Sequence, residues 1–428
     1  MRVAVIGAGI VGATSAYELA RDGHAVTVYE RHAGVASETS FANAGVVAPG
    51  YVTPWAAPGM PGKVLRHLLE RHAPVRIGGA DVLGRIPWLW RWWRACRPAV
   101  YQANRSRMYG LARYSRQQLH ALTQALGLDY EQARGVLVLL RTPRDLKQVQ
   151  AGLQVLEALQ VNFELLDAAQ CRQLEPGLSP AVPLVAGISL PQDEVGNCRQ
   201  FAQQIKAEAQ RHGARFLFQH DVRALVPGTT PRVASHDLSR AGGSGDAVEA
   251  AFDAVLLCTG HQSDGLLRPL GLRLPIAPVY GYSVTAPLSV VDEVTVRGPR
   301  AAVMDEKYKV AITRLGQRIR VAGSAEIGGV PSQMNAAALA TLYKVLDDWF
   351  PGAARLAQAR AWKGARPMLP DGPPVLGRSR LPGLWLNLGH GSSGWALSCG
   401  SARAVADLLA GREPAIDLTG LTPQRLGA

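Results

Sequence analysis

Three glycines near the N-terminus, Gly7, Gly9 and Gly12, have the spacing G-x-G-x-x-G. They stand between a short apolar run, residues 3–6, and a segment with helical periodicity, residues 10–21. In a strand–turn–helix unit the first glycine permits the tight turn, the second lets the backbone approach a pyrophosphate, and the third lets helix and strand pack closely. The N–H groups at the start of the helix then face the phosphates. This order of elements predicts a dinucleotide site rather than an isolated glycine turn.

The next apolar run, residues 25–29, ends at Glu30. A carboxylate at the end of the second strand accepts hydrogen bonds from the ribose hydroxyls of the nucleotide. The same carboxylate would repel the additional phosphate of NADP. The sequence therefore disfavours NADP and leaves NAD and FAD.

A loop of small and hydroxyl-bearing residues, ASETSFANAG at residues 36–45, follows in place of the next helix of a plain NAD-binding domain. Such a loop lets the backbone approach a large flat cofactor, with Ser40 and Asn43 as hydrogen-bonding groups. Taken alone, the segment could also be an ordinary polar loop.

The far end of the chain supplies a second segment, residues 384–412, with the pattern of a strand, a glycine loop and a helix. The loop, residues 390–394, has the sequence HGSSG. The positive end of the helix that follows would stabilise negative charge on a reduced flavin. FAD is long enough to need both chain ends, so the two segments together predict FAD as the cofactor.

Arg366 is the candidate for contact with a substrate, because glycine and proline hold the backbone around it in residues 362–377. A guanidinium is always charged and binds a carboxylate through two hydrogen bonds. An arginine that only bonds loop carbonyls is the alternative. A further buried strand, residues 255–258, is followed by a tight turn at Thr259 and Gly260.

The composition sets the limits of these predictions. The chain has 428 residues, 47% of them apolar, which is enough for two domains, and a formal net charge of +13. That charge favours anionic partners, although a basic solvated surface explains it as well. Five scattered cysteines without a CxxC motif argue against a metal cage and for a reducing compartment. Because we find no signal peptide and no apolar stretch of membrane-spanning length, we expect a cytoplasmic protein.

Residues 84–97 carry four of the nine tryptophans, interleaved with arginines. As a helix, this segment places Leu89, Trp92, Trp93 and Cys96 in one apolar stripe. Tryptophan and arginine together suit a membrane interface, so a peripheral contact with the inner face of the cytoplasmic membrane is one interpretation. A helix that caps a domain is the other.

Together these motifs carry a resemblance that covers residues 1 to about 412. The chain resembles the FAD-dependent amino-acid oxidoreductases of the D-amino-acid oxidase and glycine oxidase superfamily, and in particular the bacterial D-amino-acid dehydrogenase small-subunit family. The segments that carry it include GAGIVGATSAYELARDGHAVTVYER, ETSFANAG, PGYVTPWAAPG, LPQDEVGNCRQF, DEKYKVAITRLGQRIRVAGSAEI, RPMLPDGPPVLG and GHGSSGWALSCGS. One position departs: Tyr280 stands before GYS, where close relatives often have a lysine.

The resemblance implies an α/β fold in which a discontinuous Rossmann-type FAD-binding domain is interleaved with an α+β substrate domain that carries an antiparallel sheet. We expect the FAD domain at residues 1–50, 194–265 and 365–428, and the substrate domain at 51–193 and 266–364. The resemblance also implies an activity, the oxidative deamination of a D-amino acid, as used in amino-acid catabolism. A hydride passes from Cα to the flavin N5, the imine hydrolyses to a 2-oxo acid and ammonia, and the electrons go to a quinone or another acceptor.

The resemblance also assigns roles to matching positions. It places Gly7, Gly9, Ile10, Val11 and Gly12 at the pyrophosphate, Glu30 and Arg31 at the adenosine ribose, and Val222 at the adenine. The flavin is then lined by Thr39, Ser40, Asn43, Ala44 and Gly45, with Thr259 and Gly260 also in the cofactor site. The isoalloxazine is bordered by Gly389, His390, Gly391, Ser392, Ser393, Gly394 and Trp395, and Arg366 binds the substrate carboxylate.

Tyr282 and Tyr308 could add hydroxyl donors at the same carboxylate, or they could simply pack on a sheet face, where aromatic residues are common. We assign no general base, since the substrate amine can lose its proton to water before hydride transfer. His390 is expected to contact the flavin through its backbone.

Other functions stay open. The nearest is a flavin oxidase for glycine, sarcosine or a secondary amine of the D-proline or hydroxyproline type, and a further one is a flavin-holding electron-transfer subunit. Nucleic-acid binding is not expected, because the basic residues are dispersed and no known module is present. The preferred side chain and the oligomeric state are not readable from the sequence.

Overall fold

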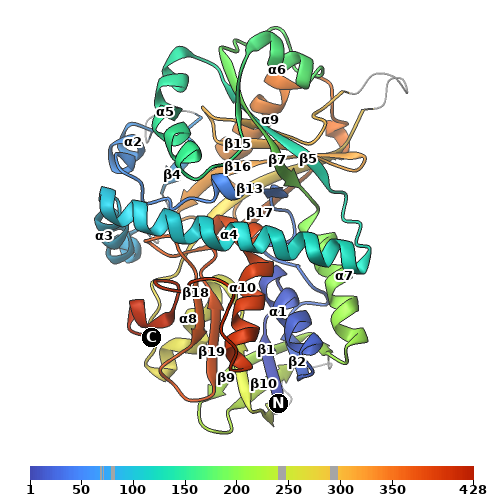
Figure 1. Ribbon diagram of the computed structural model, residues 1–428, viewed down its shortest axis with the longest axis vertical. Coiled ribbons are helices and arrows are strands. Elements are labelled where there is room, and N and C mark those ends of the chain that lie inside the picture. Colours follow the sequence, from blue (N-terminus) through green and yellow to red (C-terminus); the bar gives the residue numbers. More distant parts are fainter. Residues whose placement is uncertain (68–69, 71, 79–81, 240–246, 290–296) are drawn as a thin grey trace.

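Two β-sheets stand one above the other along the long axis of the molecule, with a long helix lying across the level between them (Figure 1). The computed structural model describes residues 1–67, 70, 72–78, 82–239, 247–289 and 297–428. Both chain ends lie in the half of the molecule that holds the first sheet (Figure 1).

The first sheet has six strands in the order β18-β19-β12-β1-β2-β8. Neighbouring strands are parallel except for the antiparallel edge pair β18 and β19. Along β1, Val3 and Val5 belong to one hydrophobic core and Ala4 and Ile6 to another, so the strand is buried on both faces, as is typical of parallel sheets. The strands are β1 (Arg2–Ile6), β2 (Ala25–Glu30), β8 (Arg215–Phe218), β12 (Ala254–Leu257), β18 (Val375–Arg378) and β19 (Leu384–Leu388).

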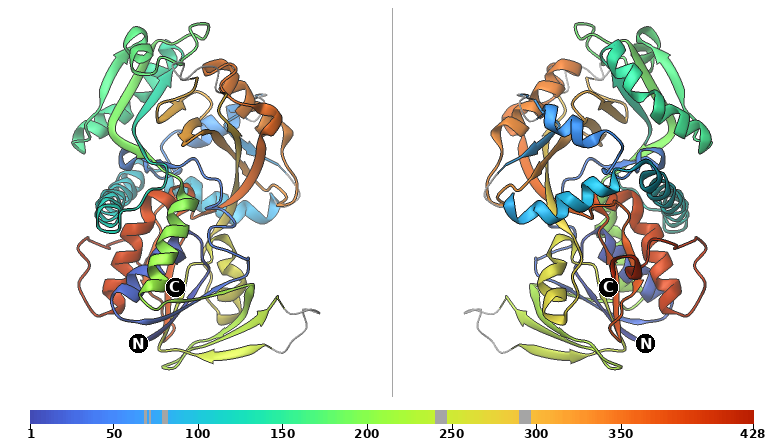
Figure 2. Two further views of the ribbon diagram at one scale, coloured as in Figure 1. Left: turned by 90° about the vertical axis from the view of Figure 1, so that its right-hand side faces the viewer. Right: turned by 90° about the vertical axis from the view of Figure 1, so that its left-hand side faces the viewer.

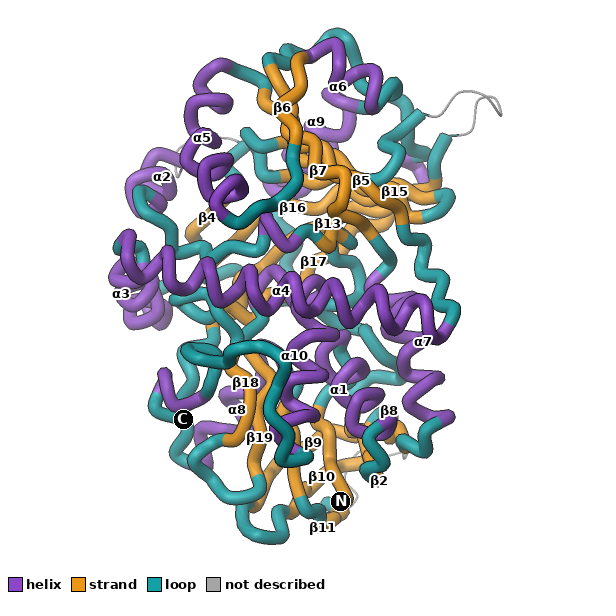
Figure 3. The backbone as a smooth tube through the Cα atoms, viewed as in Figure 1, coloured by secondary structure: helices purple, strands orange, loops and turns teal. Residues whose placement is uncertain are grey.

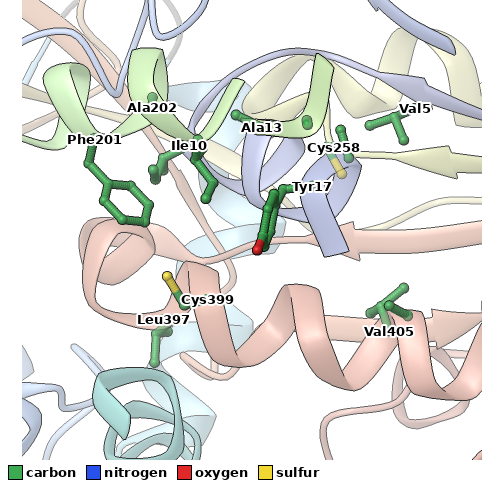
Figure 4. Close-up of a cluster of buried hydrophobic side chains, with 14 of the residues drawn as sticks. Val5, Ile10, Ala13, Tyr17, Phe201, Ala202, Cys258, Leu397, Cys399 and Val405 are labelled. Carbon is green, nitrogen blue, oxygen red and sulfur yellow. The ribbon is translucent and has the colours of Figure 1, made fainter. Parts of the chain in front are cut away.

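Helices cover one face of this sheet. Helix α1 (Ile10–Arg21) packs against α7 (Cys198–Arg211) and α10 (Gly394–Leu409), and α10 packs in turn against α4 (Pro98–Leu126). Figure 4 shows the core between these helices, where Ile10, Phe201 and Leu397 come from three distant parts of the chain. Burying their apolar side chains together is the main reason why the two chain ends fold as one unit.

The other face of the first sheet is covered by a small antiparallel sheet of order β11-β10-β9 and by the short helix α8 (Ser263–Leu267). Figure 2 shows the small sheet at the same end of the molecule as the N-terminus. Its strands are β9 (His220–Val226), β10 (Arg232–Asp237) and β11 (Val248–Ala251).

The second sheet runs in the order β17-β13-β16-β15-β14-β5-β7-β3, with β4 pairing β16 and β6 pairing β7. Its strands lie in the upper half of the molecule in Figure 3. Most neighbours are antiparallel. The strands are β3 (Val46–Val47), β4 (Val75–Ile77), β5 (Ala133–Leu140), β6 (Glu164–Asp167), β7 (Ala186–Val195), β13 (Ala277–Pro287), β14 (Ala302–Asp305), β15 (Val310–Leu315), β16 (Arg318–Ile327) and β17 (Arg360–Met368). The remaining helices of this half are α2 (Met60–His67), α5 (Pro143–Ala158), α6 (Ala168–Leu174) and α9 (Ala336–Trp349).

The predicted fold class is confirmed: a discontinuous Rossmann-type unit is interleaved with an α+β unit that carries a largely antiparallel sheet. Helix α4 belongs to the expected substrate domain by its residue numbers, yet it packs on α10. The division of the chain at residues 50, 193, 265 and 364 therefore stays a prediction.

The tryptophan-rich segment forms helix α3 (Ile86–Ala95), but its buried face differs from the predicted stripe. Trp88 and Ala95 are buried and Trp92 is half-buried, whereas Trp93 is 53% exposed and stacks on Trp90. Trp88 settles the orientation of the helix, because its indole N–H donates to the Met368 carbonyl at 3.0 Å. Of the four residues predicted to form one apolar stripe, Leu89, Trp92 and Cys96 are buried or half-buried, whereas Trp93 is exposed and does not share their environment.

Candidate active site

The glycine loop between β1 and α1 has the geometry that close packing requires. Gly7 has φ +96°, a conformation that favours glycine, and a Cβ there would lie 2.9 Å from the Cys258 carbonyl oxygen. A Cβ on Gly12 would overlap the carbonyl oxygen of Gly7. Gly9 is the N-cap residue of α1 and has no side chain that could cap the helix. Apart from the Ile10 N–H, which the Ser40 hydroxyl accepts, the N–H groups at the start of α1 are therefore available to an anion.

The predicted flavin loop, residues 36–45, is held against this turn and against the second sheet. The Ser40 hydroxyl accepts the N–H of Ile10 at 3.1 Å. The Thr39 hydroxyl donates to the Ala365 carbonyl at 2.6 Å. The loop thus contacts both helix α1, which follows strand β1, and strand β17, which carries Arg366.

Glu30 lies at the end of β2 and is nearly buried. One carboxylate oxygen accepts the N–H of Ala8 at 2.7 Å, and the other accepts the N–H of His32 at 2.9 Å. Glu30 therefore holds the glycine loop in place as well as facing the cavity. Arg31 pairs with Glu38 at the same rim.

The C-terminal loop closes the site from the other side. It runs from β19 through a short 3₁₀ turn, Gly391–Ser393, into α10. Trp395 donates its indole N–H to the Gly45 carbonyl at 3.1 Å and so ties the start of α10 to the predicted flavin loop. His390 is buried and its Nε2 lies 3.0 Å from the Ser401 hydroxyl. Burial lowers the pKa of His390 to about 3, so the ring is neutral at pH 7.

One cavity of about 1480 Å³ receives all these segments. Every predicted cofactor residue lines it except Gly12, which packs against Gly7. From the N-terminal half it is lined by Gly7, Gly9, Ile10, Val11, Glu30, Arg31, Thr39, Ser40, Asn43, Ala44 and Gly45. From the rest of the chain it is lined by Val222, Thr259, Gly260, Gly389, His390, Gly391, Ser392, Ser393, Gly394 and Trp395.

Arg366 lines the same cavity from β17. Its Nη1 donates to the Ser324 carbonyl at 2.8 Å, and its guanidinium lies so close over Gly281 that a Cβ there would overlap Nη2. Burial lowers the pKa of Arg366 to about 10, which leaves it cationic at pH 7. Among the residues that the structure describes, no carboxylate forms an ion pair with it. A buried guanidinium of this kind is suited to an anionic ligand.

Tyr282 also lines the cavity, but its hydroxyl donates to Glu326. The same carboxylate accepts from Lys363 at 3.0 Å. Burial, and then the hydrogen bond and charge of Glu326, raise the pKa of Tyr282 well above its ordinary value. Its donor is thus already used within the protein, and a role at the substrate stays a prediction.

Tyr308 lines the cavity from the turn that precedes β15 rather than from the strand itself. The guanidinium of Arg141 lies 5.0 Å from the centre of its ring, and the ammonium of Lys307 lies 5.3 Å away. The ring is therefore surrounded by cations. Whether its hydroxyl meets a ligand stays a prediction.

The residues that line the cavity but were not selected in the sequence analysis include Asn387, His261 and Ser324. Asn387 donates its amide to Ser15 at 3.0 Å, while its buried carbonyl oxygen has no hydrogen-bond partner among the residues that the structure describes. A ligand hydroxyl is a suitable donor to that oxygen, as the ribityl chain of a flavin would supply. The signal for Asn387 was its place near the end of the strand before HGSSG, inside the segment 384–412.

The residues present fit FAD. The glycine turn and the uncapped start of α1 suit its pyrophosphate, Glu30 faces the cavity at the expected ribose position, and Asn387 offers an unused acceptor. When bound, FAD supplies the capacity to accept a hydride, and the protein positions and tunes it. The described residues contain no group of His, Cys, Asp and Glu side chains that could hold a metal ion.

The comparisons with known proteins agree with an FAD-binding fold. The model of the family described as FAD dependent oxidoreductase matches residues 2–408. The chain is 45% identical to a D-amino acid dehydrogenase of Cereibacter sphaeroides, covering 100% of this chain and 96% of the relative. It is 44% identical to a D-amino acid dehydrogenase of Rhizorhabdus wittichii, covering 99% and 100%.

Among solved structures, the fold is similar to glycine oxidase from Geobacillus kaustophilus, with a TM-score of 0.75, 21% identity and 98% of each chain covered. It is also similar to L-proline dehydrogenase from P. horikoshii, with a TM-score of 0.72, 17% identity and coverage of 99% and 97%. At these identities the likeness shows the fold. With the family match over nearly the whole chain, it follows that the protein belongs to the FAD-dependent oxidoreductases and uses FAD as its cofactor.

Proposed function

We propose that the protein is a D-amino-acid dehydrogenase, which oxidises D-amino acids to 2-oxo acids and ammonia and passes the electrons to a quinone-type acceptor. The observation that carries the proposal is Arg366, a cavity-lining cation without a carboxylate partner among the described residues. Its neighbour Ala365 accepts a hydrogen bond from Thr39 of the flavin loop, so an anion at Arg366 lies next to the cofactor site. The names of the relatives at 44–45% identity point to the same reaction.

Each part of the chain then has a role. FAD is held by the loops at 7–12 and 36–45, by the segment 389–395, and by Val222, Thr259 and Gly260. Arg366 holds the carboxylate of the substrate with two hydrogen bonds and so fixes the position of Cα. The neutral His390, bonded to Ser401, does not serve as the base, and the ammonium proton of the substrate goes to water.

Anaerobic reduction of the flavin by a panel of D- and L-amino acids tests the proposal. We expect bleaching near 450 nm by several D-amino acids and by none of their L-enantiomers. Arg366→Ala should retain FAD and raise KM about 100-fold, since a charged hydrogen-bonding pair is removed. The matched control is Arg360→Ala, an exposed arginine on the same strand, which should resemble wild type.

The outcomes separate the alternatives. Bleaching by glycine, sarcosine or D-proline in preference to primary D-amino acids would favour an amine oxidase or secondary-amine dehydrogenase. Stoichiometric hydrogen peroxide during aerobic turnover would show that oxygen is the acceptor. A flavin that no amino acid reduces would leave only an electron-transfer role, and the proposal would be wrong.

We further propose that an exposed apolar patch on η2 and α3 contacts the membrane, where a quinone acceptor resides. η2 is the 3₁₀ turn Leu83–Arg85 that precedes α3. The patch consists of Leu83, Ile86, Trp90 and Trp93, which are 76%, 55%, 58% and 53% exposed. Their spacing of three and four residues places them on one side of the segment. Arginines flank them, and tryptophan with arginine is favoured at an anionic lipid surface.

None of the helices in the described part of the chain is long and apolar enough to cross a bilayer. A contact through this patch would therefore be peripheral. Co-sedimentation with anionic liposomes tests it: Trp90→Ser with Trp93→Ser should release most of the protein into the supernatant. The control pair, Leu165→Ser with Leu356→Ser, removes residues of similar exposure elsewhere and should pellet as wild type does. Equal pelleting of the tryptophan variant, or no pelleting of wild type, would contradict the contact.

A further inference from the structure

Ser324 has a backbone conformation that costs free energy. It lies in β16, opposite β13, where the pairing shifts register between Tyr280 and Tyr282. Two residues of β16, Ser324 and Ala325, oppose the single residue Gly281, which makes a β-bulge. Ser324 has φ +55°, in the left-handed region where such bulges favour glycine and where a side chain is disfavoured. A serine at this position therefore carries a conformational cost that glycine would avoid.

The hydroxyl of Ser324 has no partner within the described protein. The residue is 5% exposed, and its Oγ is buried without a hydrogen bond. A buried hydroxyl that loses water and gains no partner destabilises the fold. The backbone conformation and the unpartnered hydroxyl both destabilise the ligand-free protein. Backbone strain of this kind is concentrated at ligand sites.

Ser324 also sits directly at the arginine proposed to bind the substrate. Its carbonyl accepts Nη1 of Arg366 at 2.8 Å, and its partner across the bulge, Gly281, is the residue over which the guanidinium lies. Both Ser324 and Gly281 line the cavity. The Ser324 Oγ is buried in the structure, but a serine hydroxyl changes its position by rotation about a single bond between staggered rotamers, so another rotamer can turn it toward the cavity.

We propose that the Ser324 hydroxyl is a second hydrogen-bond donor to the substrate carboxylate, beside Arg366. The inference rests on the proposed function, since it presumes that a carboxylate occupies this position. Arg366 uses Nη1 on the Ser324 carbonyl, which leaves its other N–H groups for the ligand. The hydroxyl then donates a hydrogen bond to a carboxylate oxygen. This bond offsets the free-energy cost of an unpartnered hydroxyl in the ligand-free protein. No covalent step is involved.

Two variants separate the hydroxyl from the backbone. Ser324→Ala removes the hydroxyl and keeps the Cβ, while Ser324→Gly removes the hydroxyl and suits φ +55°. The matched control is Ser283→Ala in β13: Ser283 is also buried with an unpartnered hydroxyl, but it does not line the cavity. Holoenzyme is used throughout, and flavin content and melting temperature are recorded for each variant.

The binding probe is pyruvate, the 2-oxo acid derived from D-alanine, titrated anaerobically while the flavin absorbance spectrum is followed. We expect both Ser324 variants to retain FAD and to raise the Kd of pyruvate and the KM of D-alanine about tenfold, as the loss of one hydrogen bond to a charged group predicts. Ser324→Gly should melt at the same or a higher temperature than wild type. Weaker binding by a more stable protein is a result that a purely structural role would not produce.

The failures are distinguishable. If Arg366→Ala weakens pyruvate binding and both Ser324 variants bind like Ser283→Ala, the proposal for Ser324 is overturned and the proposed function stands. If only Ser324→Ala binds weakly and Ser324→Gly binds normally, the backbone and not the hydroxyl matters, and the proposal is overturned too. If wild type binds no pyruvate and no D-amino acid reduces its flavin, the proposed function fails with it.

Discussion

The two ends of the cavity are built in different ways. The nucleotide end consists of backbone and small residues on a parallel sheet, with Gly7 and Gly12 only five positions apart. The end that we propose for the substrate, called the substrate end below, consists of side chains on an antiparallel sheet, where Arg366 and Ser324 meet from strands β17 and β16 on either side of β13. The shape of the nucleotide end depends on glycines, which have no side chains. The shape of the substrate end depends on which side chains contact one another.

This difference predicts different responses to mutation. A Cβ added at Gly7 or Gly12 meets backbone, which cannot move without disturbing the sheet. A Cβ added at Gly281 meets the guanidinium of Arg366, the far end of a flexible side chain, which can move and lose its function. The first end should therefore fail by losing the cofactor, and the second by losing the substrate.

Gly12→Ala should have the largest effect. The new Cβ would overlap the Gly7 carbonyl, so α1 and β1 must separate, at a cost of about 1–3 kcal/mol in the free energy of unfolding. We expect most of the protein to be isolated without FAD, as measured by the ratio of absorbance at 450 and 280 nm.

Gly110→Ala is the control for this change, because Gly110 lies in the middle of α4 and a Cβ there meets nothing within 4 Å. It should retain FAD and gain about 1 kcal/mol of stability, as expected for alanine in place of glycine in a helix. Full flavin content in Gly12→Ala would refute the account of the glycine turn.

Gly281→Ala should act at the substrate end alone. The new Cβ would displace the guanidinium of Arg366, while β13 and the flavin loop stay in place. We expect normal FAD content and a KM for D-amino acids raised about 10- to 100-fold, the effect of moving a positioning group by about 1 Å. Steady-state kinetics with an artificial acceptor measures it.

Gly265→Ala is the matched control for this second change, since Gly265 lines the same cavity and a Cβ there meets nothing within 4 Å. Its KM should equal that of wild type. If Gly281→Ala lost FAD instead of substrate affinity, the two ends would not be separable, and the comparison would fail.

The same difference explains what could be predicted from the sequence. The glycine spacing, the acid at Glu30 and the helix at residues 10–21 are local, so the first sheet and its cofactor were predictable; helix α1 has the predicted bounds. The bulge at Ser324 and the bond between Tyr282 and Glu326 depend on register between strands tens of residues apart. Nothing in a local pattern specifies that register.

The orientation of helix α3 was missed for a related reason. Four tryptophans within six positions allow more than one apolar face. The bond from Trp88 to the Met368 carbonyl, a contact across 280 positions, selects the face that is buried and leaves Trp93 exposed. Periodicity alone could not distinguish these faces.

The last prediction concerns the pH dependence of stability at His390, which lies where the two ends join. Its backbone forms an isolated antiparallel bridge with Met368 at the end of β17, and its ring bonds Ser401 in α10. Burial lowers its pKa to about 3, whereas an unfolded histidine titrates near 6.5. Below pH 6.5 the unfolded chain therefore binds a proton that the folded protein does not. The free energy of unfolding is therefore undiminished by His390 above about pH 6.5, and it decreases as the pH falls from 6.5 toward 3.

From this shift we expect His390 to remove about 2 kcal/mol of stability between pH 7 and pH 5. His390→Gln cannot take up a proton and can still bond Ser401, so it should lose less stability over that interval. Chemical denaturation at the two pH values, with FAD in excess, measures the difference. If wild type and variant lost the same free energy of unfolding between pH 7 and pH 5, it would mean that water reaches this ring. The junction would then be open to solvent, and the two ends of the cavity would be held together by the Thr39 and Trp395 hydrogen bonds without a dry contact between them.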